Sequence, residues 1–397
     1  MGRLLVLGAG ILQLPVIKKA KELGHYVIAA DGCSSAPGLT LADKHIVANI
    51  VSEEVMLEIA RNEDIDGVIH PCSEVAMHVM GRINDELRLS GVGKEAAAKA
   101  TNKHLMRKAF EEYGAPSPKS ILLSSLDHGW EVFNSQFNTD AILKPSRNSG
   151  SRGISKIEKG IAKEDFKVLY DIALEESRDN SVLLEQYIDG PEFSVEIIVW
   201  DYDVTVLAVT DKKTTGAPHF VELGHSQPSR YPDEIVNRIK SAAIAGVKAL
   251  GVNACACHAE VKVQEGKAYL MEVGARLGGD FISTVLTPVS TGIDMVAAAI
   301  SCALGVRPDL AKVSPERGVC IRYFIPSPGC LKSIRNIGAI RKKNVILSEL
   351  YFKEGDMIPN LTNSTSRSGH VIVATDDVRT SIECAEDIIA EVIFEVE

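Results

Sequence analysis

No stretch of this 397-residue sequence is apolar for long enough to cross a membrane, since a spanning helix needs about 20 apolar residues. A basic surplus is missing too. The formal net charge of −10 argues against nonspecific nucleic-acid binding. The apolar run at residues 4–7 is too short for a signal-peptide core, and Val6 stands where a myristoylation motif needs Ser or Thr. We therefore expect a cytoplasmic protein that binds neither membranes nor nucleic acids.

Cysteine spacing typical of a zinc finger is also absent. The eight cysteines are scattered, and only Cys255 and Cys257 lie close together. One residue apart on a strand, these two share a face and cannot bridge without distorting it. Reduced cysteines are therefore expected.

The chain has a composition typical of a globular protein, with 45% hydrophobic and 24% charged residues, and its length suits two or three domains. Strands and helices alternate up to about residue 95, which predicts a parallel sheet. A helix rich in Ala and Lys is expected from Lys94 to Glu112. Strands dominate residues 182–210 and 252–275, and the chain is expected to end in a helix from Val378.

The first strand is followed by Gly8-Ala9-Gly10, which is part of a dinucleotide-binding fingerprint. The third glycine of that pattern is replaced by Gln13, so the fingerprint is incomplete. Asp31 ends the second strand, where a ribose-binding acid would lie. An NAD-dependent oxidoreductase therefore stays an alternative, beside a domain that binds part of another ligand or only packs.

A second candidate site begins at Lys144, where a strand runs into a loop of small residues at 146–153. Such loops expose backbone N–H groups that bind phosphate oxygens, and Lys144 and Arg152 add positive charge. The Gly-Lys-Ser/Thr order of a Walker A loop is absent. The alternative is a surface hairpin without a ligand.

Acidic residues mark the next strands. Glu185 stands where a strand runs into a linker and can accept from a purine amine, and Glu192 can accept from ribose hydroxyls. Glu192, Ser194 and Glu196 alternate and share one strand face, which could also simply be solvated. Metal binding by His219, His225 and His258 is conceivable but is not favoured by their spacing.

Glu260 and Glu272 lie on two apolar-alternating segments that predict a β-hairpin. A buried carboxylate is costly unless a cation or donors compensate it, and Arg276 follows closely. Carboxylates beside an arginine suggest Mg²⁺ and a phosphate-bearing substrate. A shared metal requires both glutamates on one face, hence an odd-length loop, such as residues 264–266, or a bulge. Two solvated glutamates are the alternative.

In their order along nearly the whole chain, these motifs resemble the ATP-grasp superfamily. Within it the sequence looks most like the carboxylate–amine ligases that include the L-amino acid (dipeptide) ligases, and it also resembles carbamoyl-phosphate-synthase and phosphoribosylglycinamide-synthetase proteins. The motifs are Thr101-Asn102-Lys103, Lys144-Pro145, the glycine loop at 149–153, Glu185-Gln186-Tyr187-Ile188, Gly190-Pro191-Glu192, Phe220-Val221-Glu222 with Gly224-His225, and the segment from Glu272 to Asp280.

The resemblance implies an α/β ATP-grasp fold with a Rossmann-like parallel-sheet domain at 1–95, an ATP-grasp domain at 96–315 that includes a lid at about 117–183, and an α+β portion at 316–397. It implies ATP and Mg²⁺ (or Mn²⁺) as cofactors, a small carboxylate and an amine as substrates, and a homodimer. The expected activity is phosphorylation of a carboxylate, such as an amino acid, to an acyl phosphate that an amine attacks, with release of ADP and phosphate.

Residue roles follow from the same resemblance. Lys103 and Lys144 would contact the ATP phosphates, and Ser149, Gly150, Ser151, Arg152 and Gly153 would form a lid over them. Glu185, Tyr187 and Ile188 would hold adenine, and Glu192 the ribose. Glu260 and Glu272 would bind the metal, Arg276 would stabilise the transferring phosphoryl group, and His225, Gly278 and Gly279 would line the substrate pocket.

The sequence departs from the pattern at Gly274, where many relatives carry an Asn that completes the metal site. The number of metal ions therefore stays open. Two other functions also stay open: an ATP-grasp enzyme of the purine-biosynthesis or biotin-carboxylase kind that activates bicarbonate or formate, and a nonenzymatic nucleotide-binding regulator.

Overall fold

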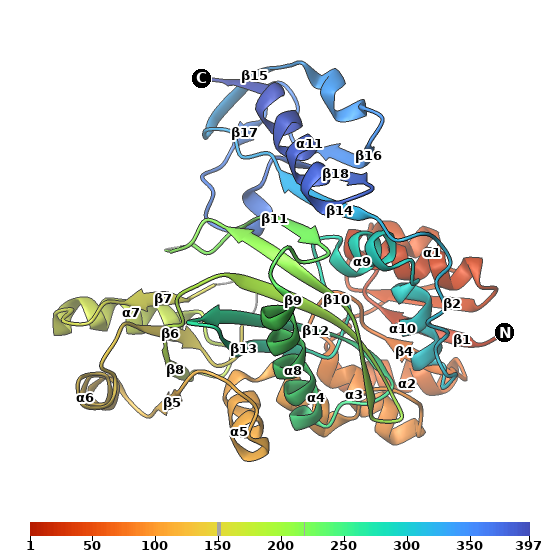
Figure 1. Ribbon diagram of the computed structural model, residues 1–397. Coiled ribbons are helices and arrows are strands. Elements are labelled where there is room, and N and C mark those ends of the chain that lie inside the picture. The colour runs from red at the N-terminus through yellow and green to blue at the C-terminus, as the bar shows by residue number, and fades with distance from the viewer. Residues whose placement is uncertain (149–151, 218) are drawn as a thin grey trace.

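The computed structural model describes residues 1–148, 152–217 and 219–397 and has a mixed α/β fold built around an eight-stranded sheet (Figure 1). The predicted Ser149, Gly150 and Ser151 of the phosphate loop lie outside the described residues. Among the described residues, no single helix is long and apolar enough to cross a bilayer. The helical segments 282–291 and 295–303, which are bent by 119° relative to each other, together have the length and apolar composition of a membrane span. Nothing in the described residues beyond length and composition supports such a span.

The N-terminal part forms a parallel four-stranded sheet in the order β3-β2-β1-β4. Its elements are β1 (Arg3–Leu7), α1 (Leu14–Glu22), β2 (Tyr26–Asp31), β3 (Lys44–Val47), α2 (Glu53–Asn62), β4 (Gly67–Ile69) and α3 (Met77–Leu87). Leu5 and Leu7 pack into one apolar cluster with α2 and α3, whereas Leu4 and Val6 pack into another with α1. Both faces of the sheet are buried, which explains its continuous apolar strands.

The helix predicted from Lys94 to Glu112 is two helices, α4 (Lys94–Thr101) and α5 (Lys103–Tyr113). The single-helix prediction is wrong because Asn102 is extended, and its side chain accepts from the Leu105 N–H to cap α5. Lys103 thereby becomes the first residue of α5, and its backbone N–H donates to the Ser146 carbonyl at 2.9 Å. The break brings this lysine beside the predicted phosphate loop.

A small antiparallel sheet in the order β5-β8-β6-β7 follows. Its elements are β5 (Ser120–Leu123), α6 (Leu126–Gln136), β6 (Ala141–Pro145), β7 (Ser155–Ile157), α7 (Lys163–Glu175) and β8 (Val182–Gln186). Helices α6 and α7 supply its core, where the Phe133 and Phe166 rings lie 5.8 Å apart. Strands β6 and β8 run side by side here, which brings Lys144 and Glu185 together.

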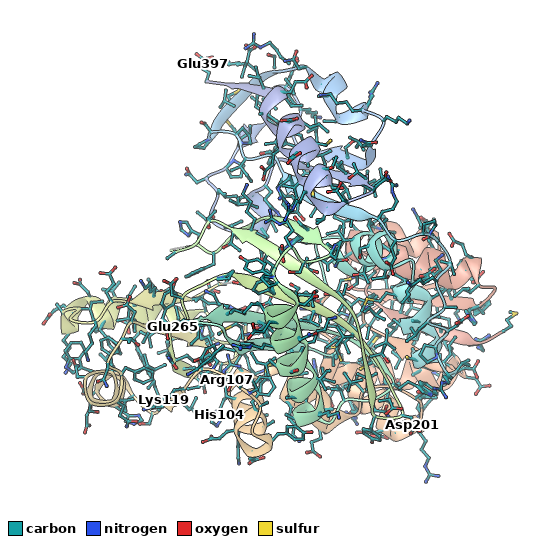
Figure 2. All side chains as sticks on the ribbon, viewed as in Figure 1. His104, Arg107, Lys119, Asp201, Glu265 and Glu397 are labelled. Atoms are coloured by element: carbon teal, nitrogen blue, oxygen red, sulfur yellow. The ribbon has the colours of Figure 1, made fainter. Side chains whose placement is uncertain are left out.

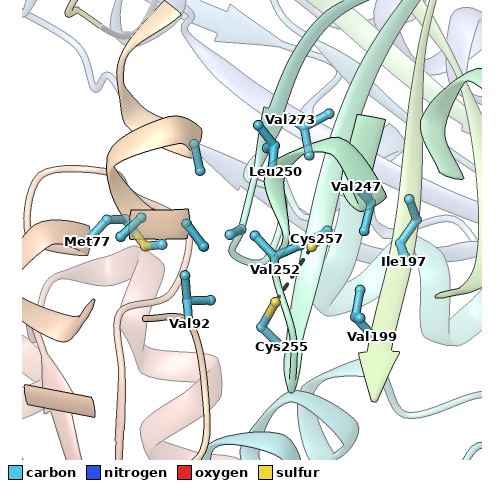
Figure 3. Close-up of a cluster of buried hydrophobic side chains, with 14 of the residues drawn as sticks. Met77, Val92, Ile197, Val199, Val247, Leu250, Val252, Cys255, Cys257 and Val273 are labelled. Carbon is cyan, nitrogen blue, oxygen red and sulfur yellow. Dashed lines mark hydrogen bonds between the residues drawn. The ribbon is translucent and has the colours of Figure 1, made fainter. Parts of the chain in front are cut away.

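The large antiparallel sheet has the order β13-β12-β9-β10-β11-β14-β18-β16. Its first five strands are β9 (Glu192–Trp200), β10 (Asp203–Thr214), β11 (Glu222–Gln227), β12 (Cys255–Gln264) and β13 (Lys267–Gly274), and α8 (Asp233–Leu250) lies against them. Val247 and Leu250 of α8 meet Ile197 of β9 in a core that also contains Met77 of the N-terminal part (Figure 3). One apolar cluster therefore fixes the first domain against this sheet.

Residues Cys255 and Cys257 lie in the same core, with their sulfur atoms 3.6 Å apart and unbridged (Figure 3). All eight cysteines are free. The predicted absence of a bridge between these two is confirmed.

The C-terminal part continues the large sheet with β14 (Gly318–Tyr323), β18 (Gly369–Thr375) and β16 (Val345–Leu350) and is covered by α11 (Val378–Glu391). The helix predicted from Val378 is confirmed as α11, but the chain does not end in it, because β19 (Ile393–Val396) follows and pairs with β15 (Gly329–Arg335). β15 also pairs with β17 (Met357–Ile358). The predicted division at residues 95 and 315 stays a prediction.

Candidate functional site

The two predicted metal glutamates face each other across the β12–β13 hairpin. Glu260 pairs directly with Glu272, so both side chains lie on one face, as predicted. The predicted three-residue loop is wrong, because Gln264 pairs with Lys267 and only Glu265 and Gly266 form the turn. Both turn residues have positive φ, 51° and 74°, as a two-residue hairpin turn requires.

A β-bulge, and not the turn, places Glu260 and Glu272 opposite each other. Val261 pairs with Leu270 and Glu260 with Glu272, so Met271 is the extra residue. In a regular ladder continued from the Val261–Leu270 pair, Met271 would lie opposite Glu260, and Glu272 would lie opposite Ala259 on the core face, which packs against α8. The bulge thus turns the second carboxylate towards the first.

Each of the two carboxylates has a buried lysine as partner. Lys103 Nζ lies 3.1 Å from Glu272 Oε2, and Lys212 Nζ lies 2.8 Å from Glu260 Oε1. Burial alone would raise the glutamate pKa values, but these lysines outweigh it, so the pKa of each carboxyl lies below its usual value. Both side chains are therefore ionised, as metal ligands must be.

The donor set fits magnesium, although the described residues contain no group of three or more His, Cys, Asp and Glu placed to hold a metal ion. In nucleotide-dependent enzymes Mg²⁺ usually keeps several waters and is bound by one or two carboxylates plus substrate phosphates. Glu260 and Glu272 would supply the two carboxylates.

The structure adds Lys212 to the site, which the sequence analysis missed. Its side chain is nearly inaccessible to solvent, and its Nζ lies 2.5 Å from Glu192, 2.8 Å from Glu260 and 3.9 Å from Glu222. Burial would lower its pKa, but the three carboxylates raise it well above its usual value. Strand pairing explains the arrangement, because β10 lies next to β9 and β11, and β9 lies next to β12.

The predicted phosphate-binding lysines approach the same cavity from different elements. Lys103 at the start of α5 also donates to the Asn148 carbonyl at 2.9 Å. Lys144 on β6 is buried, with its Nζ 2.5 Å from Glu185 Oε2. Burial lowers the pKa of Lys144 to about 8, despite the opposing effect of Glu185.

The Glu185 carboxylate is held between Lys144 and Arg107. Arg107 is a residue of α5 and is labelled in Figure 2. Arg107 Nε lies 2.9 Å from Oε1, and its Nη2 donates to Oε2 at 3.1 Å and to the Met271 carbonyl at 2.8 Å. Burial would raise the pKa of Glu185, but the two cations lower it to about 2. Arg107 therefore links the phosphate side of the cavity to the bulge.

The linker after β8 offers backbone groups for a base. The Gln186 N–H donates to Lys119 O at 2.9 Å, and the Tyr187 N–H to Asp140 O at 3.1 Å. Within the described part of the chain, no hydrogen bond from the Ile188 N–H is found. This donor lies beside the cavity and is available to an acceptor such as a purine nitrogen.

Arg276 connects the hairpin to the N-terminal part. Its Nη2 lies 3.1 Å from Oε1 of Glu74, which is carried by the loop after β4. Burial, reinforced by the charge of Glu272, raises the pKa of Glu74 to about 7. Gly274 stands two residues before Arg276, and a Cβ there would lie 3.3 Å from the guanidinium. A side chain at 274 would therefore require the Arg276 side chain to shift slightly.

The predicted substrate residues separate into two groups. His225 and Gly279 line the cavity, and His225 Nε2 lies 3.2 Å from Asp280 Oδ2. Gly278 instead approaches a buried network, where a Cβ would lie 2.6 Å from His258 Nδ1. His258 Nδ1 in turn lies 2.5 Å from Glu196 Oε1.

These groups surround one cavity of about 320 Å³. Its charged and polar lining includes Glu74, Lys103, Lys144, Asn148, Arg152, Glu185, Glu192, Lys212, Glu222, His225, Glu260, Glu272, Arg276 and Asp280. Tyr187 and Ile188 line it too, whereas Gly153 does not. Of the candidate residues within the described ranges, all but Gly153 and Gly278 are therefore brought together.

The glycine turn after β1 has a different arrangement. Asp31 Oδ2 accepts from the Ala9 N–H at 2.7 Å, and Oδ1 accepts from the Cys33 N–H at 2.8 Å. The Gln13 side chain fills the turn and donates to the Pro71 carbonyl at 3.0 Å. The acid expected to bind a ribose therefore bonds the turn itself.

Several residues of the site escaped the sequence analysis. They are Glu74, Arg107, Lys212 and Arg367, whereas Asp280 was included only as the end of a motif and without a role. Lys212 on a strand and Arg107 on a helix look like ordinary surface charges in the sequence. Only the pairing of distant segments, 202 residues apart for Glu74 and Arg276, reveals them.

Comparison with known proteins gives matches over two segments. Residues 137–285 match the ATP-grasp domain family, and residues 322–397 match the L-amino acid ligase C-terminal domain 2 family. Alanine–anticapsin ligase of Bacillus subtilis is 28% identical over 291 residues, which cover 68% of this chain and 61% of that protein.

A formate-dependent phosphoribosylglycinamide formyltransferase of Prochlorococcus marinus is 25% identical over 229 residues, or 57% of this chain and 55% of that protein. The matched segments thus span just over half the length of these relatives.

Two solved structures have the same fold over their whole length. The L-amino acid ligase of Bacillus licheniformis superposes with a TM-score of 0.84 at 19% identity, covering 100% of this chain and 99% of that one. Phosphoribosylglycinamide synthetase of Anaerococcus prevotii gives a TM-score of 0.79 at 24% identity and full coverage of both chains. The expected fold class is confirmed.

Proposed function

We propose that this chain, which carries an ATP-grasp domain and an L-amino acid ligase C-terminal domain, is an ATP-dependent carboxylate–amine ligase. The observation that carries the proposal is the single cavity in which Lys103, Lys144 and Arg276 face the paired Glu260 and Glu272. That combination suits a triphosphate with its metal beside a carboxylate to be phosphorylated.

ATP would lie between the small sheet and the large sheet. Lys103 and Lys144 would hold its phosphates, and Arg152 at the same cavity would add positive charge. No described residue accepts a hydrogen bond from the Ile188 N–H, which supports the predicted adenine position, and Glu192 lies at the cavity as a ribose acceptor would. The buried Glu185 would act on the phosphates through Lys144 rather than on the base.

Mg²⁺ would be held by Glu260 and Glu272, and when bound it would neutralise charge on the β- and γ-phosphates. Lys103 and Lys212 pair with these glutamates in the structure. When the nucleotide and metal bind, the two lysines would give up part of their contact with the carboxylates and contact the nucleotide complex instead. A Cβ at 274 would lie close to the Arg276 side chain, which supports a metal site without the usual Asn.

A free carboxylate does not react with an amine at neutral pH, so the ligase must activate it. The chain's part is mainly to position the carboxylate against the γ-phosphoryl group and to neutralise charge, with Arg276 beside the transferring group. The amine then attacks the acyl carbon of the acyl phosphate and phosphate leaves. Enclosure by the lid would exclude water, which would otherwise hydrolyse the acyl phosphate.

An amino acid is the favoured carboxylate substrate. The match of residues 322–397 to the L-amino acid ligase C-terminal domain supports this choice. The carboxylates of Glu74 and Glu222 at the cavity suit an amino group on the substrate. The cytoplasmic location and the homodimer stay predictions.

A coupled assay of ADP release over amino-acid pairs, with Mg²⁺ present, tests the proposal. Release that requires both an amino acid and an amine supports it. The similarity to the formyltransferase makes formate or bicarbonate the second candidate substrate class. ADP release that depends on bicarbonate or formate and ignores amino acids would favour that class.

A further inference from the structure

One wall of the cavity is formed by Asp280, which follows the hairpin in the chain and is held by a residue of the C-terminal part. Arg367 Nη1 donates to Asp280 Oδ2 and Nη2 to Oδ1, each at 2.8 Å. This two-pronged geometry is the strong form of a carboxylate–guanidinium pair. His225 Nε2 lies 3.2 Å from Oδ2 on the other side.

The backbone that presents Asp280 is unusual. Asp280 and Phe281 have φ values of 51° and 60°, a left-handed conformation that is uncommon outside glycine. A single π-helical turn, Ile282–Leu286, follows directly. Strained residues and π-helical turns are both found preferentially at functional sites. The chain thus maintains a costly local geometry to place this one carboxylate.

Arg367 is fixed before any ligand binds. Its guanidinium lies 3.7 Å from the centre of the Tyr323 ring, and its Nε donates to the Ser364 carbonyl at 2.7 Å. The Ser364 hydroxyl also donates to Glu222 Oε2 at 2.6 Å, and both Ser364 and Glu222 line the cavity. The C-terminal part therefore supplies a rigid positive charge behind a cavity-facing negative one.

The ion pair leaves the end of the cavity without net charge from these two residues. Asp280 lines the cavity and its side chain is 26% exposed, whereas the Arg367 side chain is 9% exposed and does not line it. A substrate would therefore contact the Asp280 carboxylate, whose negative charge is already compensated by Arg367. Removing either partner would leave a single uncompensated charge at this wall.

We propose that the Asp280–Arg367 pair determines which side chain of the activated amino acid the cavity accepts: paired, the two residues favour an uncharged side chain. Without Arg367, Asp280 favours a cationic side chain, and without Asp280, Arg367 favours an anionic one. The inference rests on the proposed ligase function.

Hydroxylamine provides a readout of the activated substrate, because it displaces phosphate from an acyl phosphate to give a hydroxamate. We would measure kcat/KM for hydroxamate formation from L-serine, L-lysine and L-glutamate with ATP and Mg²⁺. Arg367→Met should raise the lysine-to-serine ratio by about tenfold or more, and Asp280→Asn the glutamate-to-serine ratio by a similar factor, as one altered buried charge contact implies.

Matched variants separate charge from structure. Arg367→Lys keeps the charge and should keep the wild-type ratios, and Arg335→Met, at an exposed ion pair with Glu395, should not change them. The double variant, which has neither charge, should again prefer serine. If Arg367→Met does not fold by circular dichroism, the Asp280→Asn ratio decides alone.

Unchanged ratios in folded, active Arg367→Met and Asp280→Asn proteins would overturn the proposal while leaving the ligase function intact. If the wild type forms no hydroxamate from these three or from any other amino acid, the proposed function fails separately. The shifts in melting temperature caused by the same three amino acids then provide the selectivity test: altered shifts in the two variants would support the inference, and identical shifts would overturn it.

Discussion

Glu260 and Glu272 lie directly opposite each other because Met271 bulges out of the β12–β13 ladder. A regular hairpin with the same two-residue turn would separate them onto opposite faces. The most important pairing of the site is therefore created by an irregularity of the sheet. Bulges of this kind are common next to active sites.

Replacing Glu272 should abolish ATP turnover. Glu272→Ala removes one of two facing carboxylates and leaves Lys103 without its 3.1 Å partner, so we expect kcat to fall by at least about a hundredfold. Glu265→Ala, at the exposed turn of the same hairpin (Figure 2), should retain normal turnover. Steady-state ADP release provides the comparison. Near-normal turnover in Glu272→Ala would remove its metal role.

The adjacent lysines 212 and 213 should differ sharply in their contribution to stability. Lys212→Met leaves Glu192 and Glu260 without their buried cation, and breaking such a pair costs about 3–5 kcal/mol of unfolding free energy. Lys213 is exposed and pairs with Glu386 at the surface, so Lys213→Met should cost less than about 1 kcal/mol. Urea unfolding measures both. Equal losses would contradict the assigned role of Lys212.

ATP affinity should depend on pH through Lys144. Its pKa is lowered to about 8, chiefly by burial, so the ammonium loses its proton as the pH rises through that value. ATP binding should then weaken above pH 8. Glu185→Gln removes the carboxylate that supports the charged form, so the weakening should begin at lower pH. Calorimetric titration of ATP on either side of pH 8 tests this. A curve for Glu185→Gln that coincides with the wild type would refute it.

The loop that carries Glu74 should be acid-sensitive through His70. The Ala76 N–H donates to His70 Nε2 at 3.2 Å, and Nδ1 lies 2.8 Å from the Leu7 carbonyl, so the neutral ring satisfies both neighbours. Burial lowers the pKa of His70 from 6.5 to about 4. The unfolded chain then binds the proton more readily, and stability should fall by roughly 3 kcal/mol as the pH drops from 6.5 to 4.

His70→Gln is the matched variant for that prediction, because glutamine keeps a donor and an acceptor but does not titrate. Its unfolding free energy should vary less with pH over the same window. Identical pH profiles for the two proteins would show that His70 does not control the acid response.

Local patterns in the sequence predicted the parallel N-terminal sheet, and the resemblance to the ATP-grasp superfamily implied the fold class. The shared-metal hypothesis required Glu260 and Glu272 on one face. The glutamate prediction succeeded through its bulge alternative, because a bulge has no reliable signature in a single sequence. The break at Asn102 was missed because Ala and Lys continue on both sides of it. In the sequence, only Asn102 marks the break, as an N-cap residue before the first turn of a second helix.

The ionic network could not have been predicted from the sequence. Arg107 reaches Glu185 across 78 residues, and Arg367 reaches Asp280 across 87. Such contacts depend on how sheets pack, and the periodicity of single strands or helices does not encode them. The roles assigned to the individual site residues stay predictions until the variants are measured.

Transfer of oxygen-18 tests the central claim most directly. A carboxylate substrate labelled with oxygen-18 is incubated with ATP, Mg²⁺ and an amine, and the phosphorus products are examined by phosphorus-31 NMR. An acyl phosphate route predicts ADP and inorganic phosphate that carries one labelled oxygen from the carboxylate. Labelled AMP with pyrophosphate, or phosphate without label, would contradict it.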